Sequence, residues 1–168
     1  MVLAVGDLAP NFEALDQHGN LFSLEKCASP VILYITGEQL ESFEIERFLR
    51  KVNEAYENHK IEGIPLVFVT GSYGMNYDPE ENVNMVRSLD VKFPVLCDTD
   101  TTVRLTALYN SVFVPAAFYV IFNMKVFFFS RYSSYDERFK RFRPETGEAW
   151  YGNALKDAFE LANSFVKA

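Results

Sequence analysis

Two short, continuous apolar runs on either side of a segment with helical periodicity constrain the fold of this chain most. The runs are residues 31–35 (VILYI) and 64–69 (IPLVFV). Between them, apolar residues recur every three or four positions, at Ile45, Phe48, Leu49, Val52 and Tyr56. A strand that is apolar at every position is typical of a parallel sheet covered on both faces, and the intervening stripe is typical of an amphipathic helix. The pattern predicts a strand–helix–strand unit.

The rest of the chain adds elements of both kinds. Residues 11–15 and 20–24 alternate apolar with polar residues around the turn residues 16–19 (DQHG), which predicts an N-terminal β-hairpin. In chain order, the later predicted elements are a helix from Pro79, a strand at 93–97, a helix after Asp100, a hairpin with strands at 114–121 and 126–129, and a helix at 154–165. The predicted fold class is α/β, with a central mixed β-sheet, helices on both faces, an N-terminal β-hairpin and a closing antiparallel hairpin.

Length and charge limit the classes of protein to which this chain can belong. The 168 residues are 49% hydrophobic, which predicts a single domain over residues 1–168. The formal net charge of −7 argues against a nucleic-acid binder. No apolar run approaches the roughly 20 residues that a membrane span needs. Residues 1–10 (MVLAVGDLAP) lack the basic and apolar regions of a signal peptide, which predicts a cytoplasmic protein, although a periplasmic protein without its leader would look the same.

Metal-ligating residue types are few. The sequence has two cysteines, Cys27 and Cys97, and its two histidines, His18 and His59, lie far from both in sequence. This arrangement matches neither a disulfide framework nor a zinc-ligand spacing. We therefore predict no metal and no cofactor.

Four segments in the expected order resemble the redoxin branch of the thioredoxin-like superfamily, which includes the alkyl hydroperoxide reductase and thiol-specific antioxidant proteins (the peroxiredoxins) and thiol-disulfide oxidoreductases. They are residues 5–12 (VGDLAPNF), 16–24 (DQHGNLFSL), 93–98 (FPVLCD) and 109–118 (YNSVFVPAAF). The resemblance implies a thioredoxin-like fold. It also places Val114 and Pro115 at the family's cis-proline, where a protein or peptide partner binds in a groove. A purely architectural role for Pro115 fits the sequence equally well.

The chain departs from this family at the position that does its chemistry. Redoxins have a nucleophilic cysteine at the start of the helix after the first buried strand, where free N–H groups and the helix dipole favour the thiolate. Here that segment, residues 35–44, reads ITGEQLESFE and has no cysteine. Aligned to a Cys-x-x-Cys oxidoreductase, the two cysteines become Leu40 and Phe43. Aligned to a peroxiredoxin, the reactive cysteine falls near Ser42, and the two alignments stay open.

The side chains of this segment do not replace the thiol. Thr36 and Gly37 end the predicted strand, and three glutamates follow, at positions 38, 41 and 44. Their charges complement the helix dipole but would repel a thiolate. Ser42 has no visible base to activate its hydroxyl, so we interpret it as a helix cap.

Cys97 and Cys27 are the remaining thiol candidates. Buried free cysteines usually act as small hydrophobic residues, and we expect both to be inert. Lys26 would lower the pKa of Cys27 if the thiol is exposed. A disulfide between the two would need Cα atoms within about 7 Å of each other.

An insertion rich in arginine and aromatic residues, at about residues 130–150, precedes the final helix. Its basic residues include Arg138, Lys140, Arg141 and Arg143, interleaved with Tyr and Phe. We expect it to be solvated or to pack on the core. If it is functional, a protein partner or a homodimer contact is the preferred use.

Two functions follow from these observations. The first is a redoxin-family protein without the nucleophilic cysteine, acting as a non-catalytic binding or regulatory module. The alternative is a thiol-dependent antioxidant oxidoreductase, a peroxidase or disulfide reductase, that uses Cys97 or Cys27. The missing cysteine favours the first.

Overall fold

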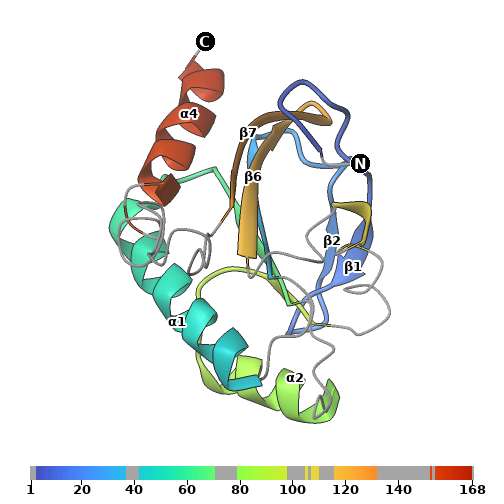
Figure 1. Ribbon diagram of the computed structural model, residues 1–168, viewed down its shortest axis with the longest axis vertical. Helices are drawn as coiled ribbons and strands as arrows, with labels where there is room; N and C mark the ends of the chain where they lie inside the picture. The colour runs from blue at the N-terminus through green and yellow to red at the C-terminus, as the bar shows by residue number, and fades with distance from the viewer. Residues whose placement is uncertain are drawn as a thin grey trace, which may run out of the picture.

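The computed structural model describes residues 3–36, 42–70, 79–97, 105, 107–109, 116–131, 152 and 154–167 (Figure 1). The elements in chain order are β1 (Glu13–Leu15), β2 (Leu21–Ser23), β3 (Val31–Thr36), α1 (Ser42–His59), β4 (Leu66–Val69), α2 (Pro79–Ser88), β5 (Val95–Leu96), β6 (Ala116–Phe122), β7 (Lys125–Arg131) and α4 (Leu155–Lys167). This order follows the predicted one from the N-terminal hairpin to the final helix, except that most of the helix predicted after Asp100 lies outside the described residues.

The central sheet is mixed, as predicted. Its five strands have the order β5-β4-β3-β6-β7, and β3, β4 and β5 run parallel. The closing hairpin adds β6 antiparallel to β3 and β7 antiparallel to β6. β1 and β2 form a separate two-stranded antiparallel sheet, in which Ala14 lies opposite Phe22.

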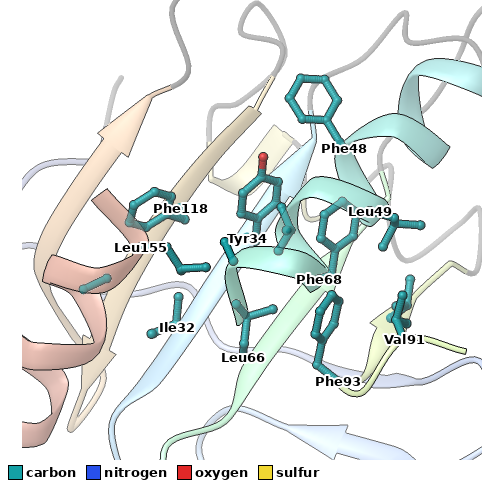
Figure 2. Packing of buried hydrophobic residues seen from close by; sticks show 14 of the residues in the cluster. Ile32, Tyr34, Phe48, Leu49, Leu66, Phe68, Val91, Phe93, Phe118 and Leu155 are labelled. Carbon is teal, nitrogen blue, oxygen red and sulfur yellow. The ribbon is translucent and has the colours of Figure 1, made fainter. Parts of the chain in front are cut away.

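The side chains of β3 explain why its sequence does not alternate. All six residues are buried, and successive side chains enter different apolar clusters on the two faces of the sheet. On the face that we call the helical face, Ile32 and Tyr34 pack against Phe48 and Leu49 of α1 and Leu155 of α4 (Figure 2). Figure 1 shows α1 and α4 on this side and β1 and β2 on the other.

The opposite face, called here the hairpin face, is covered by the N-terminal segment. Its cluster includes Val31, Leu33, Ile35, Ala9, Phe12, Leu24, Leu105 and Tyr109. The backbone N–H of Tyr109 donates to the carbonyl of Leu105 at 2.9 Å, the i to i−4 bond of a helical turn. Helical residues therefore lie on both faces, as predicted.

Stacked aromatic rings tie the strands together on the helical face. The rings of Tyr34 and Phe68 lie 4.8 Å apart at an interplanar angle of 12°. Phe93 continues the stack from Phe68 with centroids 6.3 Å apart (Figure 2). Each such pair stabilises the folded protein by about 0.5–1.5 kcal/mol, in addition to the stabilisation from burial of the ring surfaces.

The closing hairpin differs in detail from the prediction. Its turn is the two residues Asn123 and Met124, both with positive φ (51° and 61°), instead of the three residues 123–125. Positive φ at both central positions matches the twist of the flanking strands. β7 extends to Arg131, so residues 130 and 131 belong to the strand and not to the predicted insertion. Residues 132–150 of that insertion lie outside the described residues.

Candidate functional site

The carboxyl ends of the three parallel strands bring three residues into one row. Ile35 lies opposite Val69, and Val69 lies opposite Leu96, so the next residues along each strand are Thr36, Thr70 and Cys97. We call these three the carboxyl-edge row. Ligand sites of open α/β sheets lie at this edge, so the row marks the position expected for a functional site.

Hydrogen bonds join the row to its neighbours. Thr36 and Thr70 are fully buried, and their hydroxyls donate to the carbonyls of Val69 (3.3 Å) and Leu96 (3.4 Å). Each threonine thus bonds to the adjacent strand. Because these bonds lie inside the protein, they are protected from competition by water.

A buried asparagine from α2 joins the same group. Asn82 is fully buried, and its Nδ2 donates to the hydroxyl of Thr70 at 3.2 Å. Its Oδ1 has no hydrogen-bond partner among the described residues. An unsatisfied buried polar atom costs about 1–3 kcal/mol. Asn82 was not predicted from the sequence, although its position four residues before the buried Val86, on the apolar stripe of α2, was a signal for it.

The predicted active-site positions are placed only in part. Thr36 ends β3 and lies opposite Ala116, the residue that follows Pro115 in the sequence. Ser42 and Phe43 are the first two residues of α1. The other predicted positions lie outside the described residues; they are Gly37, Leu40, Val114, Pro115, Arg138, Lys140, Arg141 and Arg143.

Cys97 is the thiol at the carboxyl edge. It follows β5 directly, is 5% exposed and belongs to the apolar cluster of the helical face. A thiol in such a setting has little access to solvent, and access and thiolate formation both limit its reactivity.

Cys27 lies elsewhere, between β2 and β3. It is half-buried and lines a pocket of about 260 Å³ together with Val31, Ile121 and Met124. Its Sγ donates to the carbonyl of Ser23 at 3.4 Å, and burial raises the pKa of the thiol. Lys26 was expected to lower this pKa only for an exposed thiol; the thiol is half-buried, its desolvation raises the pKa, and Lys26 pairs with Glu13 at 3.4 Å.

The sheet separates the two cysteines. Cys97 packs in the cluster of the helical face, whereas Cys27 packs against the cluster of the hairpin face. The two cysteines are not joined by a disulfide. An intramolecular disulfide would therefore require the fold to open.

The turn of the N-terminal hairpin has one exposed and one buried residue. His18 is exposed, as predicted, and its backbone N–H donates to the carboxylate of Asp16 at 2.8 Å. The neighbouring Gln17 is only 4% exposed, and its side chain bonds to the backbone near β5. These two bonds join Gln17 to residues that lie 76 and 78 positions further along the chain, so no local sequence signal identifies them.

The described part of the chain has neither a membrane-spanning helix nor a cluster of metal-ligating side chains. None of its helices has the length and hydropathy to cross a bilayer. No group of three or more His, Cys, Asp or Glu side chains in it is arranged to hold a metal ion.

Comparisons with known proteins give the fold. No family model and no curated protein matches the sequence. A thiol:disulfide interchange protein DsbE from Chlorobium tepidum is 21% identical, with a TM-score of 0.63 over 95% of this chain and 98% of that one. An uncharacterized conserved protein from Geobacillus kaustophilus is 19% identical (TM-score 0.64; 97% and 84% covered). The peroxidoxin BcpB from Mycobacterium tuberculosis is 14% identical (TM-score 0.58; 95% and 97% covered).

Proposed function

We propose that this chain, whose fold is the thioredoxin-like fold of the redoxins, is a redoxin-type protein without the nucleophilic cysteine and acts as a non-catalytic binding or regulatory module. One observation supports this most directly. α1 begins at Ser42, soon after β3 ends, and the sequence between Cys27 and Cys97 contains no cysteine. The place where the helix dipole would activate a thiol therefore has none.

The state of the remaining thiols also supports a non-catalytic role. A catalytic cysteine needs an exposed thiolate near neutral pH. Burial raises the pKa of Cys27, so its thiolate fraction at pH 7 is below that of a free cysteine. Cys97 is 5% exposed.

The partner that we propose is a protein or peptide, bound near the carboxyl edge. Thr36 and Ala116 pair at this edge, next in sequence to Gly37 and Pro115. The basic residues Arg138, Lys140, Arg141 and Arg143 are proposed as a second contact region, for the partner or for a homodimer. The remaining predictions stay proposals as well: one domain over residues 1–168, with an insertion before α4, in the cytoplasm.

Two activity assays test the absence of thiol chemistry. Peroxide consumption with dithiothreitol and reduction of insulin are measured for wild type, Cys27→Ser, Cys97→Ser and the double variant Cys27→Ala/Cys97→Ala. We expect all four proteins to match the buffer in both assays. Turnover by wild type that one substitution abolishes would identify the nucleophile and overturn the proposal.

A binding assay tests the positive part of the proposal. Proteins retained by the immobilised wild type are identified, and their affinities for wild type and for the double variant are compared. We expect equal affinities, because binding does not depend on a thiol. Partners that bind only the wild type would indicate thiol exchange.

A second function has one observation in its favour. Cys97 is in the carboxyl-edge row, the position expected for a functional site, so a thiol oxidoreductase would use Cys97 before Cys27. The second function would be supported by activity, in either assay, that is lost in Cys97→Ser and retained in Cys27→Ser.

A further inference from the structure

The first residues of the N-terminal segment, which spans residues 6–24, lie against β7, one edge strand of the central sheet. We call this segment the strap. The N–H of Gly6 donates to the carbonyl of Val126 at 2.8 Å, and the N–H of Val126 donates to the carbonyl of Asp7 at 3.0 Å. The N–H of Ala9 then donates to the carbonyl of Met124, also at 2.8 Å. The strap thus pairs with the start of β7 as a short strand would.

At the other edge of the sheet, β5 has outward-facing backbone groups of its own. The carbonyls of Pro94 and Leu96 accept hydrogen bonds from N–H groups in and directly after β4, at 2.9 and 3.1 Å. Because backbone groups alternate in direction along a strand, the carbonyl of Phe93 and the N–H of Val95 face away from β4. An incoming strand would bind these two groups.

The side chain of Gln17 already binds both of them. Its Nε2 donates to the carbonyl of Phe93 at 3.0 Å, and its Oε1 accepts from the N–H of Val95 at 2.7 Å. A primary amide presents one donor and one acceptor side by side, as the peptide backbone of a neighbouring strand does. The guanidinium of Arg87 in α2 fixes the residue further, since its Nε donates to the Gln17 carbonyl at 3.0 Å.

The same segment therefore reaches both edges. Between its two edge contacts it crosses the hairpin face, where Phe12 and Ala14 are buried in the cluster. Unpaired edge strands are templates for pairing with other chains, and natural proteins cover them. β5 has only two residues, and its outer side is occupied by the Gln17 side chain together with one antiparallel bridge between Asp16 and Leu96.

We propose that the strap is an edge-blocking device, which prevents the β5 edge of one molecule from pairing with that of a second copy. Gln17 is its closing contact. Without the glutamine amide, the Phe93 carbonyl and the Val95 N–H lose their hydrogen-bond partner, and the bridge between Asp16 and Leu96 is the remaining described contact of the strap with β5. The inference is independent of whether the protein is an enzyme or a binding module.

The test replaces the amide while keeping the volume of the buried side chain. Gln17→Met is compared with wild type and with His18→Ala, a change at the exposed neighbouring residue of the same turn. Hydrogen exchange reports the protection of the Val95 amide, and sedimentation velocity at several concentrations reports self-association. In Gln17→Met we expect Val95 to exchange roughly tenfold faster and association to rise with concentration, with neither change in His18→Ala.

Either of two results overturns the proposal. If exchange at Val95 is unchanged, the amide does not close the edge. If exchange rises and sedimentation stays that of wild type, the closed edge does not control association. Should Gln17→Met fail to fold, as judged by lost protection in β3, Arg87→Ala replaces it. That variant removes the hydrogen bond between α2 and the Gln17 carbonyl and leaves the core intact. We expect faster exchange at Val95 and stronger self-association in it as well, both to a smaller extent than in Gln17→Met.

Discussion

The hydroxyl of Tyr119 in β6 donates a hydrogen bond to the backbone carbonyl of Tyr109 at 2.7 Å. The hydroxyl of Tyr109 in turn donates to the carbonyl of Pro10 at 2.6 Å, and the two rings meet edge to face with centroids 5.3 Å apart. Two phenols thus link the central sheet, a helical turn and the N-terminal segment. Tyr109 occupies the middle of this chain of contacts and is fully buried.

Tyr109 should make the protein sensitive to alkaline pH. Burial, and secondarily the neighbouring Tyr119, raise the pKa of Tyr109 above its ordinary value of about 10. Above pH 10 the unfolded chain therefore loses this proton while the folded chain keeps it. The free energy of unfolding should fall as pH rises, by at most about 1.4 kcal/mol per pH unit from this group.

Tyr109→Phe isolates that effect in urea titrations at pH 7 and pH 11. At pH 7 the variant should be less stable by about 1 kcal/mol, because it lacks the hydrogen bond to Pro10. At pH 11 the difference should shrink or reverse, since the variant has no phenol to ionise at this position. Parallel pH profiles for the two proteins would contradict the argument.

Asn82 should not tolerate a negative charge. Asn82→Asp would bury a carboxylate beside the hydroxyl of Thr70. We expect the variant to be less stable than wild type by about 3 kcal/mol at pH 7. The deficit should decrease as pH falls towards 4, because the carboxyl group can then be neutral in the folded state.

Asn82→Leu is the matched control for this substitution. It removes the bond to Thr70 and also the unsatisfied Oδ1, so it should cost only about 1 kcal/mol at every pH. Chemical denaturation at pH 4, 5.5 and 7 measures both variants. Equal and pH-independent losses for Asp and Leu would show that charge burial is not the cause.

Cys27 should alkylate slowly and with an alkaline pH profile. Because burial raises its pKa, the thiolate fraction at neutral pH is small. In a Cys97→Ala background, the rate with iodoacetamide should be below that of free cysteine at pH 7 and should rise through a midpoint above the ordinary cysteine pKa. A midpoint below that value would mean that Lys26 or another cation controls the thiol after all.

Asp90, just beyond α2, should favour glycine over alanine. Its φ of 49° lies in the left-handed region, where the backbone of any residue other than glycine is strained. Asp90→Gly should be more stable than Asp90→Ala by about 1 kcal/mol. Thermal unfolding of the two variants and wild type decides the matter, and equal melting temperatures for Gly and Ala would argue against backbone strain. The exposed pair with Lys92 (2.9 Å) is expected to contribute little.

The sequence predicted the features that depend on neighbours along the chain. The uninterrupted apolar run became β3, and the stripe of Ile45, Phe48, Leu49 and Val52 became the buried side of α1. The turn at residues 16–19 formed as predicted, with Asp16 accepting bonds from the backbone of His18 and Asn20. Each of these features has a signal within a few residues, in periodicity or turn chemistry.

The features that the sequence did not predict depend on distant partners. Gln17 resembled any polar turn residue, and only the position of β5 shows why it is buried. Asn82 in α2 donates a hydrogen bond to Thr70, which follows β4, and this contact appears only in the folded chain. The pKa direction of Cys27 could not be predicted, because a neighbouring lysine is visible in a sequence, whereas the burial of the thiol beside a pocket lined by Val31, Ile121 and Met124 is not.

The strap also determines the order in which the protein can be completed during synthesis. Gly6, Asp7 and Ala9 bind residues 124 and 126, and Gln17 binds residues 93 and 95, which all emerge from the ribosome much later. At about 5–20 residues per second, translation reaches residue 126 roughly 6 to 23 s after it has passed residue 12. During that time the apolar side chains of Phe12, Ala14 and Leu24 lack the surface that buries them. The nascent chain therefore carries an exposed hydrophobic segment, available to a chaperone, until the closing hairpin has been made.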